Sequence, residues 1–260
     1  MFGSHSATQL TPAHGGAAEL RLLGVPALRV AQRHIALSAK DAALLALAAL
    51  SGPIRADRVA ALLWPQAAAK QADTSLRQRL YRLRQETGLP LLSSGALLQL
   101  SAELGTDLAP TLERIGHDAH AGSDELLGDI DYEDLPDLAE WVRGQRQHWR
   151  EQRDAALAAA LAQCEKEGAV VRGLAYAHRL IDADPLAEHA QRCLMRLHYL
   201  RGDGVAAIAA LNASNNASKT NSARGHRPKR SSCWRPSSVA PRHCRRGVRL
   251  RRPACCARPG

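Results

Sequence analysis

The sequence predicts a mainly α-helical protein with two unlike domains, a small α+β domain at residues 19–108 and an all-α domain of helical repeats at residues 109–211. Three observations lead to this division. Short strand-like runs flank three amphipathic helical segments in the first domain, and a 34-residue repeat occupies the second. Aromatic residues make up only 3% of the chain while hydrophobic residues make up 45%, so the core consists mainly of Leu, Ala and Val, which favours packed helices.

The start of the chain predicts a leader followed by a small antiparallel sheet. Residues 1–18 are rich in Gly, Ser, Ala and His, and we interpret them as a flexible leader. Residues 19–24, 27–30 and 34–37 are short strand candidates. The leader lacks the basic and apolar regions of a signal peptide, and no apolar run reaches the ~18 residues of a membrane span. We therefore expect a cytoplasmic protein without a membrane partner.

Three helices and a hairpin follow the strands. Ser38 is a candidate cap for the first helix, which ends at residues 51–53, and the second helix begins near Arg55 and stops at residues 64–65, where Pro cannot continue it. The third helix closes at Gly88. Residues 91–100 are predicted as two short strands about a Ser-Gly turn. This order predicts a winged helix-turn-helix, with the third helix as the reader and the hairpin as the wing.

The third helix carries the features of a DNA reader. Leu76, Leu80 and Leu83 recur at i, i+4 and i+7 and form one apolar stripe, while Thr, Gln, Tyr and Arg side chains point away from it. Guanidinium groups bind phosphates or guanine edges, and amides and hydroxyls reach other base edges. The helix by itself is equally consistent with a solvated amphipathic helix whose arginines only confer solubility.

The net charge of +10 does not support DNA binding by itself, because the charge is unevenly distributed. Residues 213–260 contain 13 Lys and Arg and no Asp or Glu. Residues 1–110 carry a net charge of +4, and residues 111–212 carry −7. The DNA-binding prediction therefore depends on where the arginines cluster.

The segment before the repeat offers two groups that could suggest chemistry. His117 and His120 stand at i, i+3, but no third ligand has a convincing spacing, so we expect two exposed histidines and no metal. Residues 129–137 are rich in Asp and Glu, which could indicate acid–base catalysis. Without a nucleophile nearby, the better interpretation is a helix start, with Asp134 or Asp137 as the cap of a long helix over residues 138–167.

An internal repeat follows the long helix. The pattern Gly-x-x-Val-x-x-Leu-Ala at residues 168–175 recurs 34 residues later as Gly-x-x-Val-x-x-Ile-Ala at residues 202–209, and Asp184-Pro185 divides the interval into two helices. This is the period of tetratricopeptide repeats, whose stacked helix pairs bind other proteins. Residues 186–199 are predicted as the second helix of the pair.

Two segments together resemble a known family. Arg-x-x-Arg-Val-Ala-x-Leu-Leu-Trp-Pro at residues 55–65 and Ser-Leu-Arg-Gln-x-Leu-x-Arg-Leu-Arg at residues 75–84 look like the DNA-binding half of the SARP-type bacterial transcriptional regulators. Tyr132, Glu140-Trp141 and Asp184-Pro185 resemble the bacterial transcriptional activation domain of the same proteins. The resemblance implies binding to direct repeats of DNA and recruitment of RNA polymerase. It makes the following residues the candidate DNA contacts: Thr74, Ser75, Arg77, Gln78, Arg79 and Arg82.

The apolar period fails near Leu211, which leaves residues 212–260 as a basic segment without a predicted core. It could be a disordered arm that adds nonspecific phosphate affinity. It could also be the product of a reading-frame change in a GC-rich gene, since it combines Arg, Pro, Ala, Cys and Gly with no acidic residue, and we favour this second interpretation. Four of the six cysteines lie here, so the cysteines do not indicate a disulfide framework.

These observations predict a sequence-specific DNA-binding transcriptional regulator. Its expected partners are double-stranded DNA, RNA polymerase and a second copy of the chain, and no cofactor is expected. The alternative is a tetratricopeptide-like adaptor whose winged helix contacts only proteins. An enzyme is not expected, because the sequence lacks the phosphate-binding Gly-rich loops, the G-x-S-x-G elbow and the H-E-x-x-H motif.

Overall fold

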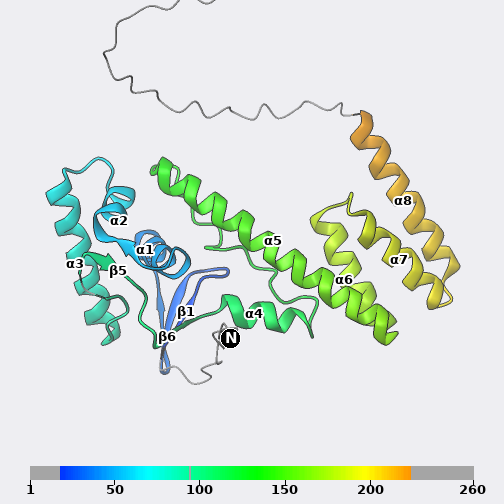
Figure 1. The fold of residues 1–260 in the computed structure, drawn as a ribbon, viewed down its shortest axis with the longest axis horizontal. Helices are drawn as coiled ribbons and strands as arrows, with labels where there is room; N and C mark the ends of the chain where they lie inside the picture. Colours follow the sequence, from blue (N-terminus) through cyan, green and yellow to red (C-terminus); the bar gives the residue numbers. More distant parts are fainter. Residues whose placement is uncertain (1–17, 94, 224–260) are drawn as a thin grey trace, which may run out of the picture.

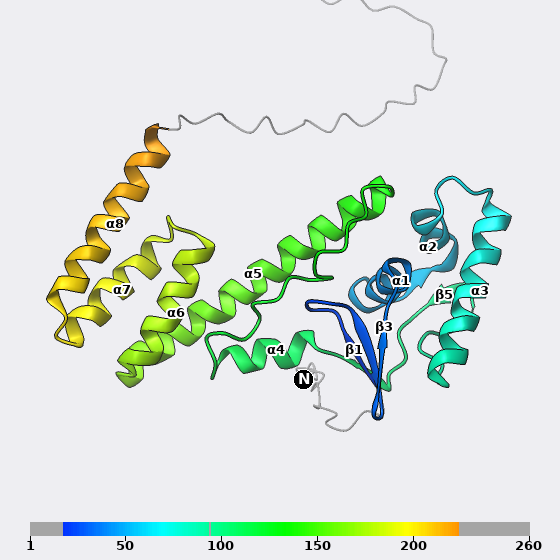
Figure 2. The same ribbon diagram turned by 180° about the vertical axis from the view of Figure 1, so that it is seen from behind.

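The computed structural model describes residues 18–93 and 95–223, and the predicted leader and most of the basic tail lie outside these residues. The molecule is elongated. The winged-helix domain lies at one end and the helical repeats at the other, with one long helix running between them (Figures 1 and 2). The predicted fold class, a winged helix-turn-helix followed by an all-α repeat domain, is confirmed.

The N-terminal sheet has four strands in the order β3-β2-β1-β6. The predicted antiparallel strands are present as β1 (Ala18–Arg21), β2 (Ala27–Val30) and β3 (Arg33–Ala36). The fourth strand, β6 (Leu104–Thr106), was not predicted, and it runs parallel to β1 with Ala18 opposite Leu104. Three residues are too few to show an alternating pattern in the sequence.

Three helices follow the first three strands, as predicted: α1 (Ala39–Leu50), α2 (Ala56–Leu63) and α3 (Ala69–Thr87). The hydroxyl of Ser38 accepts a hydrogen bond from the backbone N–H of Asp41 at 3.3 Å, so Ser38 is the predicted cap of α1. Buried residues occur on nearly every side of α1, which makes it the centre of the domain core.

The predicted wing is present and is joined by a third strand. Leu92 pairs with Leu100 across the hairpin, and the backbone N–H of Ser93 donates to the carbonyl of Gln99 at 2.9 Å. In addition, β5 (Leu97–Leu98) pairs antiparallel with β4 (Ile54–Arg55), the two residues that precede α2. This pairing anchors the wing to the start of α2.

The connector contains α4 (Leu108–Ile115) and a loop that leads into α5 (Pro136–Glu167), the predicted long helix. The prediction that Asp134 or Asp137 caps α5 was wrong, because Leu135 occupies the cap position and makes no side-chain capping bond. Pro136 sets the start of the helix, since its fixed φ suits the first helical position and disfavours a helical residue before it. Asp137 still lies in the first turn, where a negative charge favours the helix dipole.

The repeat domain consists of α6 (Val170–Ala183), α7 (Glu188–Leu200) and α8 (Gly204–Ala223). The equivalent glycines of the repeat, Gly168 and Gly202, both have positive φ, at 66° and 80°. Each ends one helix before the next begins, which explains why glycine recurs at this position.

The sequence placed the end of the repeat domain at residue 211 and a disordered tail from residue 212, and this boundary was wrong. Helix α8 continues to Ala223 without a break. No Gly or Pro interrupts residues 205–224, so no helix breaker ends α8 near residue 211. The hydroxyl of Ser214 also bonds the side-chain oxygen of Gln191 on α7. Residues 224–260, including four cysteines, lie outside the described residues.

Candidate nucleic-acid interface

Helix α3 lies at the end of the molecule farthest from α8, with one long side facing away from the domain core (Figures 1 and 2). The buried side carries Leu76 and Leu83, which are 1% and 4% exposed, and Leu80 packs beside them. The predicted apolar stripe is therefore confirmed. The opposite side, called here the outer face of α3, consists of five exposed residues, namely Thr74, Gln78, Tyr81, Arg82 and Gln85.

Two further candidates, Ser75 and Arg77, lie at the two margins of the outer face. Arg77 is exposed, and its guanidinium group pairs with the carboxylate of Asp73 one turn earlier. An exposed pair of this kind contributes only ~0–1 kcal/mol, so the guanidinium can exchange Asp73 for a phosphate or a base at little cost. The structure thus brings five of the six predicted contacts together on one side of α3, where Tyr81 and Gln85 are also exposed.

Arg79 is the predicted contact that the structure does not place with the others. Its side chain is only 20% exposed, and its Nη1 atom donates to Asp41 Oδ1 at 2.8 Å and to Ser38 Oγ at 3.0 Å. Both acceptors belong to the N-terminal turn of α1. On the helical wheel Arg79 is next to the leucine stripe, so its long stem crosses the core margin toward α1. Arg79 therefore ties α3 to α1.

The exposed arginines near the outer face differ in how firmly they are held. Within the described residues, no hydrogen bond or ion pair joins the side chain of Arg82 or Arg84 to another residue. Arg55, at the strand that holds the wing, pairs with Asp57 at 2.6 Å. This guanidinium group lowers the pKa of Asp57, so the pair remains ionised across the physiological range. Arg82 and Arg84 are thus two cations of this surface that no described residue pairs with.

A groove of about 760 Å³ separates α3 from the wing. Its floor is apolar and includes Leu80, Leu91 and Leu98, and its rim on the α3 side carries Arg77 and Arg84. The groove places the helix and the hairpin side by side on one surface of the domain. A reader helix and a wing need this relation to contact one duplex together.

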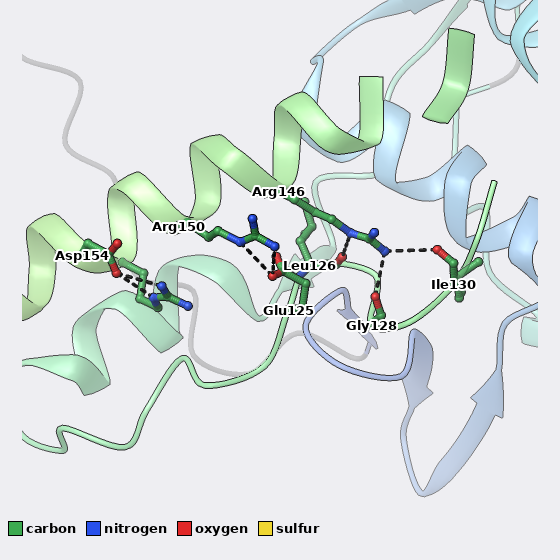
Figure 3. A network of polar contacts seen from close by, with 8 residues as sticks. Glu125, Leu126, Gly128, Ile130, Arg146, Arg150 and Asp154 are labelled. Atoms are coloured by element: carbon green, nitrogen blue, oxygen red, sulfur yellow. Dashed lines mark hydrogen bonds and ion pairs between the residues drawn. The ribbon is translucent and has the colours of Figure 1, made fainter. Parts of the chain in front are cut away.

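The loop that precedes α5 connects the winged-helix domain, which carries the outer face of α3, to the long helix. Arg146 on α5 donates three hydrogen bonds to carbonyl oxygens of this loop, to Leu126 at 2.9 Å, Gly128 at 2.7 Å and Ile130 at 3.1 Å (Figure 3). One turn later, Nε and Nη2 of Arg150 both donate to Glu125 Oε2, at 2.9 and 2.6 Å. The loop is thereby held along one side of α5.

The same loop is also bonded to the winged-helix domain. The backbone N–H of Leu127 donates to Leu22 at 2.7 Å, and that of Gly24 donates to Glu125 at 2.9 Å. Further along, the Tyr132 hydroxyl donates to the carbonyl of Ala39 at 3.0 Å. Burial raises the pKa of Tyr132 to about 12, so this hydroxyl remains a donor at neutral pH. The loop therefore joins α5 to the sheet and to α1.

Sequence reasoning missed three features of this site. Arg84 is not among the predicted contacts, although its spacing of seven residues from Arg77 places it on the same margin of the helix. The role of Arg79 depends on α1, whose position no local pattern reveals. The hydrogen bonds of Arg146 could not be predicted either, because their acceptors are backbone carbonyls, which every residue type has.

The two histidines of the connector and the helices of the described residues also bear on predictions made from the sequence. His117 and His120 are both exposed. Among the described residues, no helix is long and apolar enough to cross a membrane.

Comparison with known proteins agrees with this architecture. Residues 125–220 match the family model described as the bacterial transcriptional activator domain. A search of the curated proteins gave no match. Among solved structures, the fold is similar to EmbR of Mycobacterium tuberculosis in complex with a low-affinity phosphopeptide, with 18% identity and a TM-score of 0.60. The alignment covers 79% of this chain and 60% of the EmbR chain, so the present chain corresponds to only part of that protein.

The likeness to EmbR establishes a shared fold, and the family model identifies the later domain. The match begins in the loop held by Arg146 and extends to residue 220, well into the part of α8 that sequence analysis had assigned to the tail. The predicted resemblance to the SARP-type transcriptional regulators is confirmed: residues 125–220 match the bacterial transcriptional activator domain, and they follow a domain with winged-helix architecture.

Proposed function

We propose that the chain is a sequence-specific DNA-binding regulator whose α3 enters the major groove. The observation that carries this proposal is the outer face of α3, where hydroxyl, amide and guanidinium groups lie exposed opposite a buried leucine stripe. An α-helix with such a face fits the width of the major groove, and its side chains match the donors and acceptors of base edges.

We assign the predicted contacts to two roles. Thr74, Ser75, Arg77, Gln78 and Arg82 are assigned to DNA contact because they lie on or beside the outer face. Arg79 is assigned to positioning. Its bonds to Ser38 and Asp41 fix the angle between α3 and α1, and that angle sets how deeply the outer face enters the groove.

The wing and the exposed arginines supply contact to the DNA backbone in this proposal. Arg84 on the margin of α3 and the hairpin beyond the groove flank the reader on one side. Phosphate contacts position a protein on a duplex without specifying sequence, and each contact adds to the salt dependence of binding. We therefore expect affinity to fall steeply as the salt concentration rises.

The activator domain is proposed to contact the transcription machinery or a second copy of the chain. One side of α8 presents large apolar side chains to solvent, with Val205, Ile208 and Leu211 exposed by 82%, 62% and 45%. These residues follow one another at intervals of three along the helix, while Ala210 packs inward on the domain core. An exposed apolar row of this kind is typical of a protein-binding surface.

The test is a selection of genomic DNA fragments by the purified full chain, repeated with a variant in which Arg77, Gln78 and Arg82 are changed to Ala. The expected result is enrichment of a short motif that the variant loses, with at least a tenfold weaker affinity for it. A matched control changes Arg172 and Arg201 to Ala, which removes an equal number of positive charges, but from the activator domain. This control should retain the motif.

Two results would contradict the proposal. If the full chain enriches no motif at physiological salt, the winged helix does not read DNA, and the adaptor hypothesis takes its place. If the triple variant and the control lose the same affinity, binding depends on overall charge and the outer face is not the reader.

A further inference from the structure

A cluster of three side chains in the activator domain has the composition of a metal site. Glu165 comes from the last turn of α5, and His189 and Cys193 come from the first half of α7. One ligand atom from each residue lies within 4.8 Å of the other two. The cluster belongs to the helical repeats and shares no residue with the outer face of α3.

The geometry on α7 suits one ion. His189 and Cys193 stand at i and i+4, which places them on the same side of the helix. The Cys193 sulfur is 3.7 Å from His189 Nε2 and 4.0 Å from Nδ1. Two ligands of a tetrahedral zinc ion, bound at roughly 2.3 Å through sulfur and 2.1 Å through nitrogen, are separated by roughly 3.6 Å. The sulfur and Nε2 therefore already stand at the spacing that this ion requires.

The third ligand has an unsatisfied oxygen. Glu165 Oε1 is buried and makes no hydrogen bond to any described residue. Arg196 Nη1 lies 3.8 Å away, which is an ion-pair distance but too long for a hydrogen bond. The thiol of Cys193 also interacts with the Glu165 carboxylate as a hydrogen-bond donor, and a cation that replaced the thiol proton would neutralise this carboxylate more fully. Because the side chain of Arg196 is 73% exposed, it only partly neutralises this oxygen.

We propose that Glu165, His189 and Cys193 bind one Zn²⁺ ion, with water as the fourth ligand. Thiolate, imidazole and carboxylate together are ligands of zinc, whereas Mg²⁺ and Ca²⁺ prefer oxygen alone. A thiolate and a carboxylate balance the two charges of the ion. On binding, the Cys193 thiol loses its proton to solvent and the S–Zn bond forms, so no oxidant or reductant is needed. The ion would join the end of α5 to α7.

The experiment measures metal binding by the full chain, in a background where the four cysteines outside the described residues, Cys233, Cys244, Cys255 and Cys256, are changed to Ser. The chain is freed of metal with a chelator, and Zn²⁺ is titrated in by calorimetry. Co²⁺ is then used as an absorbing substitute, since a bound thiolate gives a sulfur-to-cobalt charge-transfer band. One equivalent of Zn²⁺ should bind and raise the melting temperature.

Single variants test each ligand. Cys193→Ser should abolish the charge-transfer band, and His189→Ala and Glu165→Gln should each weaken Zn²⁺ binding by at least tenfold. Cys164→Ser is the matched control, because Cys164 is the other buried thiol of the described residues and lies outside the cluster. It should bind Zn²⁺ as the parent does.

The exposed position of His189 keeps the test valid if Cys193→Ser fails to fold, because an alanine at an exposed site should leave the fold intact. Failure of the parent to bind Zn²⁺ would overturn the proposal. So would a charge-transfer band that survives in a folded Cys193→Ser variant, or tight binding of copper without zinc. These outcomes are independent of DNA binding.

Discussion

Changing Arg146 to Met should weaken the attachment of the loop over residues 125–132 to α5 and destabilise the protein. Met keeps much of the apolar stem of Arg but donates no hydrogen bond. The substitution removes the three bonds to the carbonyls of Leu126, Gly128 and Ile130 (Figure 3). Leu126 and Leu127 are 1% and 0% exposed, so the loop cannot move away without exposing two core leucines.

The expected cost follows from these contacts. A hydrogen bond to a charged group contributes about 1.5–3 kcal/mol, but bonds that share one side chain are not additive, and water can replace some of them in a partly buried site. We expect a loss of about 3 kcal/mol in the free energy of unfolding. For a protein of this size each kcal/mol lowers the melting temperature by roughly 2–4 °C, which gives a decrease of roughly 6–12 °C.

The assay is thermal and urea unfolding of the parent, Arg146→Met and the control Arg150→Met. Arg150 is one turn away and is 47% exposed in its pair with Glu125. An exposed pair contributes ~0–1 kcal/mol, so the control should change the stability little. Equal losses in the two variants, or a loss below about 0.5 kcal/mol for Arg146→Met, would refute the argument, since surface substitutions alone reach that size.

Two further predictions concern the same junction. Gly128→Ala should cost about 3 kcal/mol or more, because φ is +50° and the new Cβ would lie 2.6 Å from the carbonyl oxygen of Gly24, while Gly88→Ala, with φ of +71° and nothing within 4 Å, should cost only about 1 kcal/mol by urea unfolding. Similar losses for the two variants would show that the Gly24 contact is unimportant. Tyr132→Phe should change the pH dependence of stability. The pKa of Tyr132 is raised from 10.0 to about 12 in the folded state, so its contribution is complete below pH 10 and is lost as the pH rises toward 12. Urea unfolding at pH 8 and pH 11 should show the parent losing up to about 1.4 kcal/mol more than the variant, and parallel losses would contradict this.

The sequence was sufficient where local physics decides the structure. The leucine spacing of α3, the cap at Ser38 and the stop before Pro65 each depend on neighbours within a few residues, and each was predicted correctly. The repeat was equally visible, because Gly168 and Gly202 hold the same backbone conformation. Such features are encoded in residue types and spacings.

The sequence was insufficient where a residue acts through a distant part of the chain. In the sequence, Arg79 and Arg82 are both arginines of the third helix and look alike. Only the hydrogen bond between Arg79 and Asp41, which lies 38 positions earlier in the chain, distinguishes a positioning residue from a candidate DNA contact. The parallel strand β6 and the bonds of Arg146 are nonlocal in the same way. The end of the repeat domain was misplaced for another reason, since an absent apolar period does not end a helix that has no breaker.

Helix α5 belongs to the hydrophobic cores of both domains and so limits how they can move relative to each other. Its first half contributes Leu138, Val142 and Trp149 to the core of the winged helix, and its second half contributes Leu157 and Leu161 to the core of the repeats. Its 32 residues span roughly 48 Å at 1.5 Å per residue. Because one continuous helix belongs to both cores, and Arg146 and Tyr132 fix the loop beside it, the two domains cannot turn freely. If α3 reads an operator as proposed, the DNA sequence also sets the direction in which the apolar side of α8 faces its partner.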